Sequence, residues 1–404
     1  MTSWRKTLKR AAYSAEGRYD RWRFRVRNRL GRLDDAIILP YRGHGTPDCF
    51  HLKGRVLEDR GIASTADTDS AWRNLRNTVR RFNSAEIRGA RVRARFGRAV
   101  YDALTDQEGY FSFDFPPDTA LLSDRDYWYD VTLELVDYPG PRRADTRITA
   151  QVVVPPSNAE FGVISDLDDT VIKSDVVNLL KLARNTFLKN AHTRLPFEGV
   201  AAFYQALQAG THGAYNPIYY VSSSPWNLYD LIAEFFDVRG IPAGPLFLAE
   251  LGLRSDQFIK PDRRKHKLKS IAHLLETHPE LPFLLVGDSG ELDPEIYLQS
   301  VLDHPGRIQS IYIRDVGGKV RHQRLERVAA RIAEAGSEML IVKDTVAAAV
   351  HASTHGYILP EALPIISAER TQDKVAPNPV ERLIQDLDRG VRTEGGTTGL
   401  GTED

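Results

Sequence analysis

The stretch Phe161–Asp175, FGVISDLDDTVIKSD, joins an apolar run to a cluster of carboxylates. Its first residues have the composition of a buried β-strand, and Asp166, Asp168 and Asp169 follow at once. Carboxylates this close together repel each other, and burying one without a partner is costly. Because a bound cation would offset both costs, the stretch predicts a cation site at the end of a strand.

Strand and helix patterns alternate along the chain around this stretch. Six apolar strands are predicted, at residues 161–167, 217–223, 245–251, 281–288, 307–315 and 339–344. Helical patterns are found at residues 199–210, 227–240, 266–279 and 325–336. Near-continuous apolar strands separated by helices favour an α/β fold with a parallel, doubly wound sheet. Ligands of such sheets bind beyond the carboxyl ends of the strands.

The region before this sheet, residues 36–155, is rich in short strands. Alternating or β-branched runs occur at residues 51–59, 89–97, 98–106, 109–116, 127–137 and 146–155, with one helix predicted at 71–84. We therefore expect an all-β, sandwich-like domain that acts in scaffolding or recognition. The prolines and small residues of VPPSNAEFG (154–162) indicate a linker to the next domain.

The composition excludes several classes of protein. The 404 residues hold 54 acidic and 54 basic side chains, so net charge predicts no partner. Cys49 is the only cysteine, which excludes an intramolecular disulfide and a cysteine-rich zinc site. No apolar run approaches the roughly 20 residues that span a bilayer, and charges interrupt the N-terminus throughout. These features predict a cytoplasmic protein.

The two ends of the chain differ in character. Residues 1–35 form a basic leader with interleaved aromatic side chains, a composition typical of peripheral contact with an anionic membrane. A solvated helix that packs its aromatic side chains on the next domain is the alternative, and no nucleic-acid partner is expected. The tail, residues 368–404, has the composition of a disordered segment.

Polar residues follow several predicted strands at the point where each strand ends. Asp166, Ser222 and Asp288 end three of them, and Asp293 follows shortly after Asp288. Oxygen ligands from two strands suit Mg²⁺. A strand-end carboxylate can attack phosphorus, so Asp166 is the expected nucleophile, with Asp168 exchanging protons with the leaving alcohol and with water. Ser222 can donate a hydrogen bond to a phosphoryl oxygen, and a lysine can offset its charge.

These positions resemble the motif set of the haloacid dehalogenase (HAD) superfamily. The first motif, D-x-D-x-T, corresponds to Asp166–Thr170, the second to Ser222, and the fourth to Gly287-Asp288 through Asp293. The third is a lysine, placed at Lys267 with Lys265 as the alternative. The resemblance implies a Rossmann-like HAD sheet with three sets of site residues: catalytic Asp166, Asp168, Ser222 and Lys267; metal-binding Asp166, Asp168, Asp288 and Asp293; and substrate-binding Thr170, Ser223 and Lys265.

A narrower resemblance lies in three longer segments. FGVISDLDDTV, IYYVSSSPWNLYD and LLVGDSGELDPEIY are similar to the catalytic domain of the actin-patch-associated phosphatidate phosphatases, over about Val154 to Ile358. LPYRGHGTPD and TDQEGYFSFDF resemble the β domain found with it. The resemblance implies Mg²⁺-dependent hydrolysis of phosphatidate to diacylglycerol and phosphate, a reaction of phospholipid metabolism. It also implies a catalytic domain over residues 156–367.

Alternative functions stay open at this point. Only residues 171–216 separate the first two motifs, so a small cap of one or two helices and an open site are expected. Such a site also suits a soluble metabolite, a phosphoprotein or a nucleic-acid end, and a catalytically silent membrane-binding module is a further alternative. Separately, His351 and His355 have the i, i+4 spacing of metal ligands on a helix, but the sequence indicates no third ligand.

Overall fold

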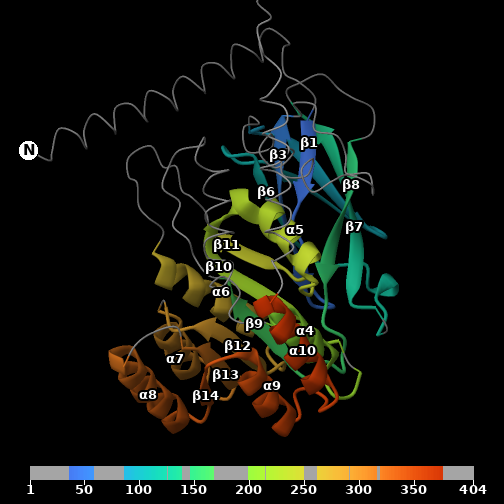
Figure 1. The fold of residues 1–404 in the computed structure, drawn as a ribbon. Coiled ribbons are helices and arrows are strands. Elements are labelled where there is room, and N and C mark those ends of the chain that lie inside the picture. The colour runs from blue at the N-terminus through green and yellow to red at the C-terminus, as the bar shows by residue number, and fades with distance from the viewer. Residues whose placement is uncertain are drawn as a thin grey trace, which may run out of the picture.

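The computed structural model describes residues 36–58, 86–124, 126–138, 146–167, 199–213, 215–249, 262–290, 292–315 and 319–375. These residues form two β-sheets with helices on one of them (Figure 1). The predicted leader, the predicted helix at 71–84, the cap segment up to residue 198 and the tail beyond Val375 lie outside the described residues.

Sheet B is parallel and has six strands in the order β11-β10-β9-β12-β13-β14. They are β9 (Gly162–Asp166), β10 (Ile218–Pro225), β11 (Leu246–Ala249), β12 (Phe283–Asp288), β13 (Ile308–Arg314) and β14 (Glu338–Val342). Each coincides with a strand predicted from an apolar run. From β9 the chain adds β10 and β11 on one side and then continues with β12 on the other. The strand order therefore reverses next to β9.

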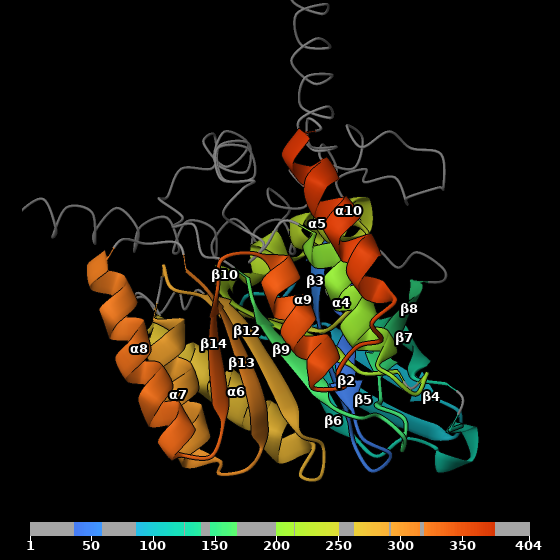
Figure 2. The same cartoon turned by 60° about the horizontal axis from the view of Figure 1, so that its bottom comes forward.

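Helices cover both faces of sheet B (Figure 2). One face carries α4 (Val200–Ala209), the short 3₁₀ turn η2 (Trp226–Leu228), α5 (Tyr229–Arg239), α9 (Thr345–Thr354) and α10 (Ala362–Val375). The other carries α6 (Arg263–Thr277), α7 (Asp293–Asp303) and α8 (Lys319–Glu334). On β12, Phe283 and Leu285 pack toward α6 and its neighbours, whereas Leu284 and Val286 pack toward α4. This alternation is expected of a strand buried on both faces and confirms the predicted α/β class.

Sheet A contains eight strands among the described residues, most of them paired antiparallel. They are β1 (Ala36–Pro40), β2 (Gly43–Gly45), β3 (Phe50–Glu58), β4 (Arg91–Phe96), β5 (Ala99–Leu104), β6 (Tyr110–Phe115), β7 (Trp128–Asp137) and β8 (Arg147–Val153). A 3₁₀ turn, η1 (Thr119–Leu121), lies between β6 and β7. The pairing of β2 with β8 is parallel, and β3 pairs with β1, β2 and β6.

An aromatic core explains how sheet A bends back on itself. Phe50 on β3 lies 5.1 Å from Phe96 on β4, ring centre to ring centre, although these strands are not neighbours in the sheet. Tyr101 on β5 and Phe115 on β6 are likewise 5.1 Å apart. Two parts of one hydrogen-bonded sheet thus face each other, which agrees with the sandwich-like packing expected from the sequence.

The two sheets pack against each other through aromatic side chains. Tyr41, between β1 and β2, stacks on Trp226 with ring centres 4.6 Å apart and lies 4.4 Å from Tyr229 of α5. The backbone N–H of Arg42 donates to the Tyr229 hydroxyl at 2.7 Å. Stacked aromatic pairs add to the free energy gained by burial. Sheet A is therefore held against the part of sheet B that carries β10 and α5.

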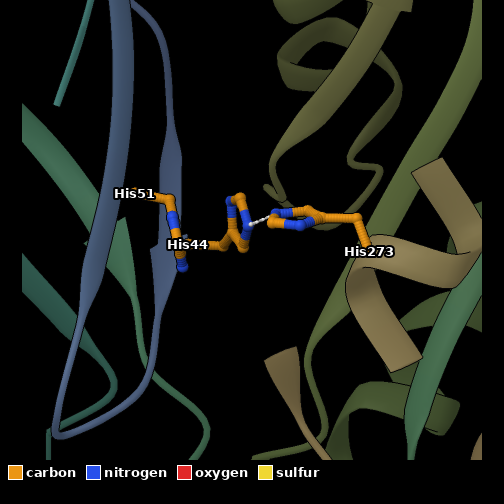
Figure 3. A group of neighbouring side chains, drawn as sticks. All are labelled: His44, His51 and His273. Atoms are coloured by element: carbon orange, nitrogen blue, oxygen red, sulfur yellow. Dashed lines mark hydrogen bonds between the residues drawn. The ribbon is translucent and has the colours of Figure 1, made fainter. Parts of the chain in front are cut away.

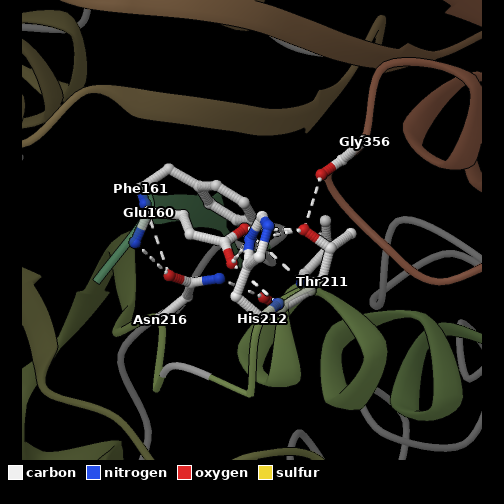
Figure 4. A network of polar contacts seen from close by, with 7 residues as sticks. Glu160, Phe161, Thr211, His212, Asn216 and Gly356 are labelled. Carbon is white, nitrogen blue, oxygen red and sulfur yellow. Dashed lines mark hydrogen bonds and ion pairs between the residues drawn. The ribbon is translucent and has the colours of Figure 1, made fainter. Parts of the chain in front are cut away.

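A polar network fixes the start of β9 (Figure 4). The buried Asn216 side chain accepts from the backbone N–H groups of Glu160 and Phe161 at 2.8 and 3.3 Å and donates to the Leu207 carbonyl at 3.0 Å. The Glu160 carboxylate accepts from the N–H and the ring of His212 at 3.0 and 2.8 Å. Because these bonds join the residues before β9 to the loop between α4 and β10, they set where β9 enters the sheet.

The helices differ from the expectation at the C-terminal side. α7 had no predicted counterpart, and α10 continues to Val375, beyond the boundary that the sequence placed after residue 367. Ile366 of α10 is fully buried, and the Glu369 carboxylate accepts from the Ala202 N–H of α4 at 2.7 Å. Among the described residues, no helix has the length and apolar character needed to cross a membrane.

The buried His278 predicts a pH dependence of stability. Its Nε2 lies 2.9 Å from the Tyr219 hydroxyl, and burial, followed by the neighbouring His273 and His51, lowers its pKa from 6.5 to about 4. Between these pKa values the unfolded chain binds a proton that the folded chain does not. The free energy of unfolding should therefore fall by roughly 2 kcal/mol on this account between pH 7 and pH 5.

Urea titrations of the unaltered protein and of His278→Gln at pH 7 and pH 5 measure how much His278 contributes to this change in the free energy of unfolding. The glutamine keeps a polar partner for Tyr219 but does not titrate, so its loss of stability at pH 5 should be smaller. Equal losses in both proteins would contradict the assignment.

Candidate active site

Three of the predicted site residues lie at one edge of sheet B: Asp166 and Asp288 are the last residues of β9 and β12, and Ser222 lies in the second half of β10. The β9–β10 pairing places Asp166 opposite Val221, the residue before Ser222. On the other side of β9, Val286 pairs with Ser165, so Asp288 follows at the same edge of the sheet. Asp166, Ser222 and Asp288 are all buried. They lie where the strand order reverses, which is where open α/β sheets bind their ligands.

Lys267 brings a positive charge into this edge. Its Nζ lies 2.5 Å from Asp166 Oδ1 and 2.7 Å from Asp293 Oδ1, and the three side chains are at most 4 % exposed. Asp262 caps α6 by accepting from the Lys265 N–H at 3.2 Å, which fixes where the helix begins. Lys267 therefore falls at the start of the buried stripe of α6, which continues as Ser270, Ile271, Leu274 and Leu275. A lysine on an apolar stripe indicates a buried ion pair.

Asp293 links the lysine to the loop after β12. Its Oδ2 accepts from the Asp288 N–H at 3.3 Å, and its Oδ1 is the atom that contacts Lys267. A Cβ at Gly287 would lie 2.8 Å from Asp293 Oδ2, so only glycine permits this approach. Asp288 Oδ1 in turn accepts from the Gly290 N–H at 2.6 Å. The glycine before Asp288, within β12, thus leaves the space that the Asp293 carboxylate occupies.

The surroundings of the cluster are negative and closely packed. Burial, and then the charges of Asp293 and Asp166, raise the pKa of Tyr297 well above its usual value. Its hydroxyl stays protonated and donates to the Val286 carbonyl at 2.8 Å. On the other face, the hydroxyls of Ser165 and Tyr204 are 2.7 Å apart. These bonds hold the ends of β9 and β12, and with them the positions of the carboxylates.

The three serines in the second half of β10 are arranged differently from one another. Ser222 Oγ accepts from the Ser224 N–H at 3.0 Å, a local bond just beyond Val221, the last residue of β10 that pairs with β9. The Ser223 hydroxyl is buried, and no group in the described part of the chain bonds to it. Burying a hydroxyl without a hydrogen-bond partner costs free energy. A ligand oxygen that accepts a hydrogen bond from Ser223 would remove this cost.

The structure separates the two candidate lysines. Lys265 is exposed and lines a shallow surface hollow with Lys269, Asp303 and His304, whereas Lys267 is buried against the carboxylates. Side chains two positions apart on a helix point in nearly opposite directions, so only one of them can reach the cluster. The Lys265 side chain is not brought to it. Asp168 and Thr170 lie outside the described residues.

The sequence did not indicate a third group near the predicted histidine pair, and the structure supplies one. His351 lies on α9 and His355 directly follows this helix, and their Nε2 atoms lie 3.1 and 3.6 Å from Glu338 Oε2. Glu338 begins β14, which leads directly into α9. The start of a strand and the end of the following helix lie at the same end of a βα unit. This rule could have identified Glu338 as the third group from the sequence.

Two curated relatives match parts of this chain. Residues 161–315 match the family described as "Phosphatidate phosphatase APP1, catalytic domain". "Phosphatidate phosphatase APP1" of Saccharomyces cerevisiae is 33% identical over 155 residues, 38% of this chain and 26% of that protein. An uncharacterized protein of Schizosaccharomyces pombe is 26% identical over 220 residues, 54% of this chain and 35% of that protein. The chain thus matches between a quarter and about a third of the length of these relatives.

Comparison with solved structures adds no argument. A carbohydrate acetylesterase from Xanthomonas citri has a TM-score of 0.24 and 11% identity, over 72% of each chain. The matched segment, in contrast, begins at the first residue of the opening stretch and contains Asp166, Ser222, Lys267, Asp288 and Asp293. Residues 161–315 of this chain, which hold these five side chains, are therefore similar to the phosphatidate phosphatase APP1 catalytic domain.

Proposed function

We propose that this chain is a Mg²⁺-dependent phosphomonoester hydrolase of the HAD superfamily that acts on phosphatidate. The observation that carries the proposal is the buried Asp166 carboxylate, held by Lys267 at the end of the strand next to the reversal of strand order. The family of the matched segment supports phosphate as the group removed and a phosphorylated lipid as the substrate.

Asp166 acts as the nucleophile in this proposal. One of its carboxylate oxygens attacks phosphorus, the bond from phosphorus to the ester oxygen breaks, and the leaving alcohol takes a proton from Asp168. Water then attacks the same phosphorus, gives a proton to Asp168, and the bond to Asp166 breaks. The ammonium of Lys267, 2.5 Å from Asp166, would orient this carboxylate for attack on phosphorus.

The charges of the cluster fit a divalent cation. Asp166, Asp288 and Asp293 bring three buried carboxylates together, and Lys267 supplies one ammonium. Negative charge is therefore in excess among these buried groups, and their oxygens are the ligands that Mg²⁺ prefers. Asp166, Asp168, Asp288 and Asp293 would hold the ion, which when bound would offset charge on the phosphoryl oxygens.

Two hydroxyl groups of β10 complete the proposed phosphate site. Ser222 would donate to a phosphoryl oxygen, and the buried Ser223 hydroxyl, which has no partner among the described residues, would donate to a second. Thr170 and Lys265 stay predictions from the sequence, the first because it lies outside the described residues and the second because its side chain is exposed elsewhere. A peripheral approach of the basic leader to the membrane, by a cytoplasmic protein, is part of the same proposal.

Phosphate release by the purified chain tests this function. Phosphatidate in mixed micelles and a panel of soluble phosphomonoesters would each be assayed with Mg²⁺ and with a chelator. We expect Mg²⁺-dependent release from phosphatidate well above the panel. Release from soluble esters alone would overturn the lipid substrate and keep the reaction class. No release from any of them would overturn the enzyme and favour a membrane-binding module.

A further inference from the structure

Three histidines from separate parts of the chain meet where sheet A packs on α6 (Figure 3). They are His44 on β2, His51 on β3 and His273 on α6. One potential ligand atom from each lies within 4.8 Å of the others. His44 Nε2 and His273 Nε2 are 2.9 Å apart, and the rings of His44 and His51 stack with centres 4.8 Å apart.

The β2–β3 hairpin places two of these rings side by side. His44 and His51 are directly opposite each other in the antiparallel pairing, so their side chains share one face. The glycines on either side of His44 allow this close pairing. A Cβ at Gly43 would lie 2.5 Å from the His51 carbonyl oxygen, and one at Gly45 equally close to that of Cys49. The hairpin is thus built to present both imidazoles to α6.

Imidazole rings suit a cation rather than an anion, because a neutral imidazole has one nitrogen with a free lone pair. His44 is buried, and His51 and His273 are partly buried, so the three rings meet away from bulk water. A single hydrogen bond between His44 and His273 uses two of the three rings and leaves the place of His51 unexplained.

An acidic partner orients the third ring. His51 Nδ1 lies 2.6 Å from Asp114 Oδ1, across the β3–β6 pairing. With its Nδ1–H donated to this carboxylate, His51 keeps a lone pair on Nε2. A histidine that donates one nitrogen to a carboxylate and offers the other to a metal is the usual arrangement around protein-bound zinc.

We propose that His44, His51 and His273 bind a Zn²⁺ ion that ties sheet A to α6. Three neutral imidazoles are a known zinc ligand set, and Zn–N bonds of about 2.0–2.1 Å need only small movements of rings already this close. Mg²⁺ prefers oxygen ligands, so this site is distinct in chemistry from the carboxylate cluster. Since α6 also carries Lys267, the ion would fix the helix that positions this lysine.

Zinc binding by the full chain, freed of metal and of any histidine tag, tests the proposal. All proteins would carry His351→Ala, so that the cluster of Glu338, His351 and His355 does not contribute to the Zn²⁺ bound. Zn²⁺ affinity is measured by competition with a chromophoric chelator, and thermal unfolding is followed with and without Zn²⁺. The variants are His273→Ala, His51→Ala (a half-buried residue) and Asp114→Asn. The matched control is His304→Ala, at the residue that directly follows α7.

We expect one tightly bound Zn²⁺ in the background protein and in the His304→Ala control, with a higher unfolding temperature when zinc is present. Asp114→Asn should weaken binding about 10- to 100-fold, and His273→Ala and His51→Ala by more. Circular dichroism confirms that each variant is folded. The proposal would be overturned if the background protein did not bind Zn²⁺ tightly. It would also be overturned if folded His273→Ala and His51→Ala bound Zn²⁺ as tightly as the background protein does.

Discussion

Replacing Asp166 by asparagine is expected to lower phosphate release by about 10⁴-fold or more, the scale reached when a covalent nucleophile or its activating partner is removed. The amide has nearly the shape of the carboxylate but no charge and little nucleophilicity. Lys267 keeps Asp293 as a partner at 2.7 Å, so the variant should fold. Initial rates with phosphatidate and Mg²⁺, together with a circular dichroism spectrum, measure both effects.

Asp102→Asn is the matched control for this substitution. Asp102 forms an exposed ion pair with Arg93 on sheet A, at 2.7 Å, and surface pairs of this kind contribute at most about 1 kcal/mol to stability. Its activity should equal that of the unaltered protein. If Asp166→Asn kept a tenth or more of the activity, Asp166 could not be the nucleophile.

Replacing Lys267 by methionine is expected to cost about 3–5 kcal/mol of unfolding free energy, because it leaves buried carboxylates without their cation. Methionine fills a similar volume, so the loss reports charge rather than a cavity. The measurement is a urea titration in the presence of chelator. Added Mg²⁺ should restore part of the loss in the variant, since the same carboxylates are its proposed ligands. Phosphate release should be lost as well, because the Asp166 carboxylate loses its partner.

Lys269→Met on the same helix is the control for this prediction. Lys269 is exposed, and a surface substitution there should change the free energy of unfolding by no more than about 0.5 kcal/mol. Similar small losses for Lys267→Met and Lys269→Met would contradict the buried ion pair described above.

Sheet B was the most predictable part of the fold. All six of its strands are apolar runs, because a parallel strand covered by helices on both faces has few polar positions. The short β1 and β2 were missed because five and three residues carry too little periodicity to identify a strand. α7 was missed because it begins at Asp293, the last residue of the acidic motif. The segment DPEIY therefore resembles a continuation of the motif rather than the first turn of a helix.

The site was predictable where it depends on strand ends and unpredictable where it depends on helix rotation. Asp166, Ser222 and Asp288 follow from the rule that parallel strands end at one edge. The choice between Lys265 and Lys267 depends on which face of α6 is buried, and the apolar stripe of Ile271, Leu274 and Leu275 contains that information. The ion pair of Lys267 with Asp293 depends on two separate helices, so no local pattern reports it.

The cluster of His44, His51 and His273 could not be predicted from the sequence for another reason. His44 and His273 are far apart in the chain and meet only because sheet A packs on sheet B. The proline-rich segment 154–162 indicated a linker but gave no orientation between the two parts. Packing between sheets is decided by side-chain fit, as between Tyr41 and Trp226, and fit is not periodic in the sequence.

The most direct test of the proposed nucleophile is a rapid acid quench of the full chain during turnover of radiolabelled phosphatidate with Mg²⁺, followed by peptide mapping. We expect phosphate covalently bound to the peptide that contains Asp166, on that residue and labile to hydroxylamine as acyl phosphates are. The peptide should carry no label in Asp166→Asn. Active turnover with no label on Asp166, or with label on a different residue, would contradict it.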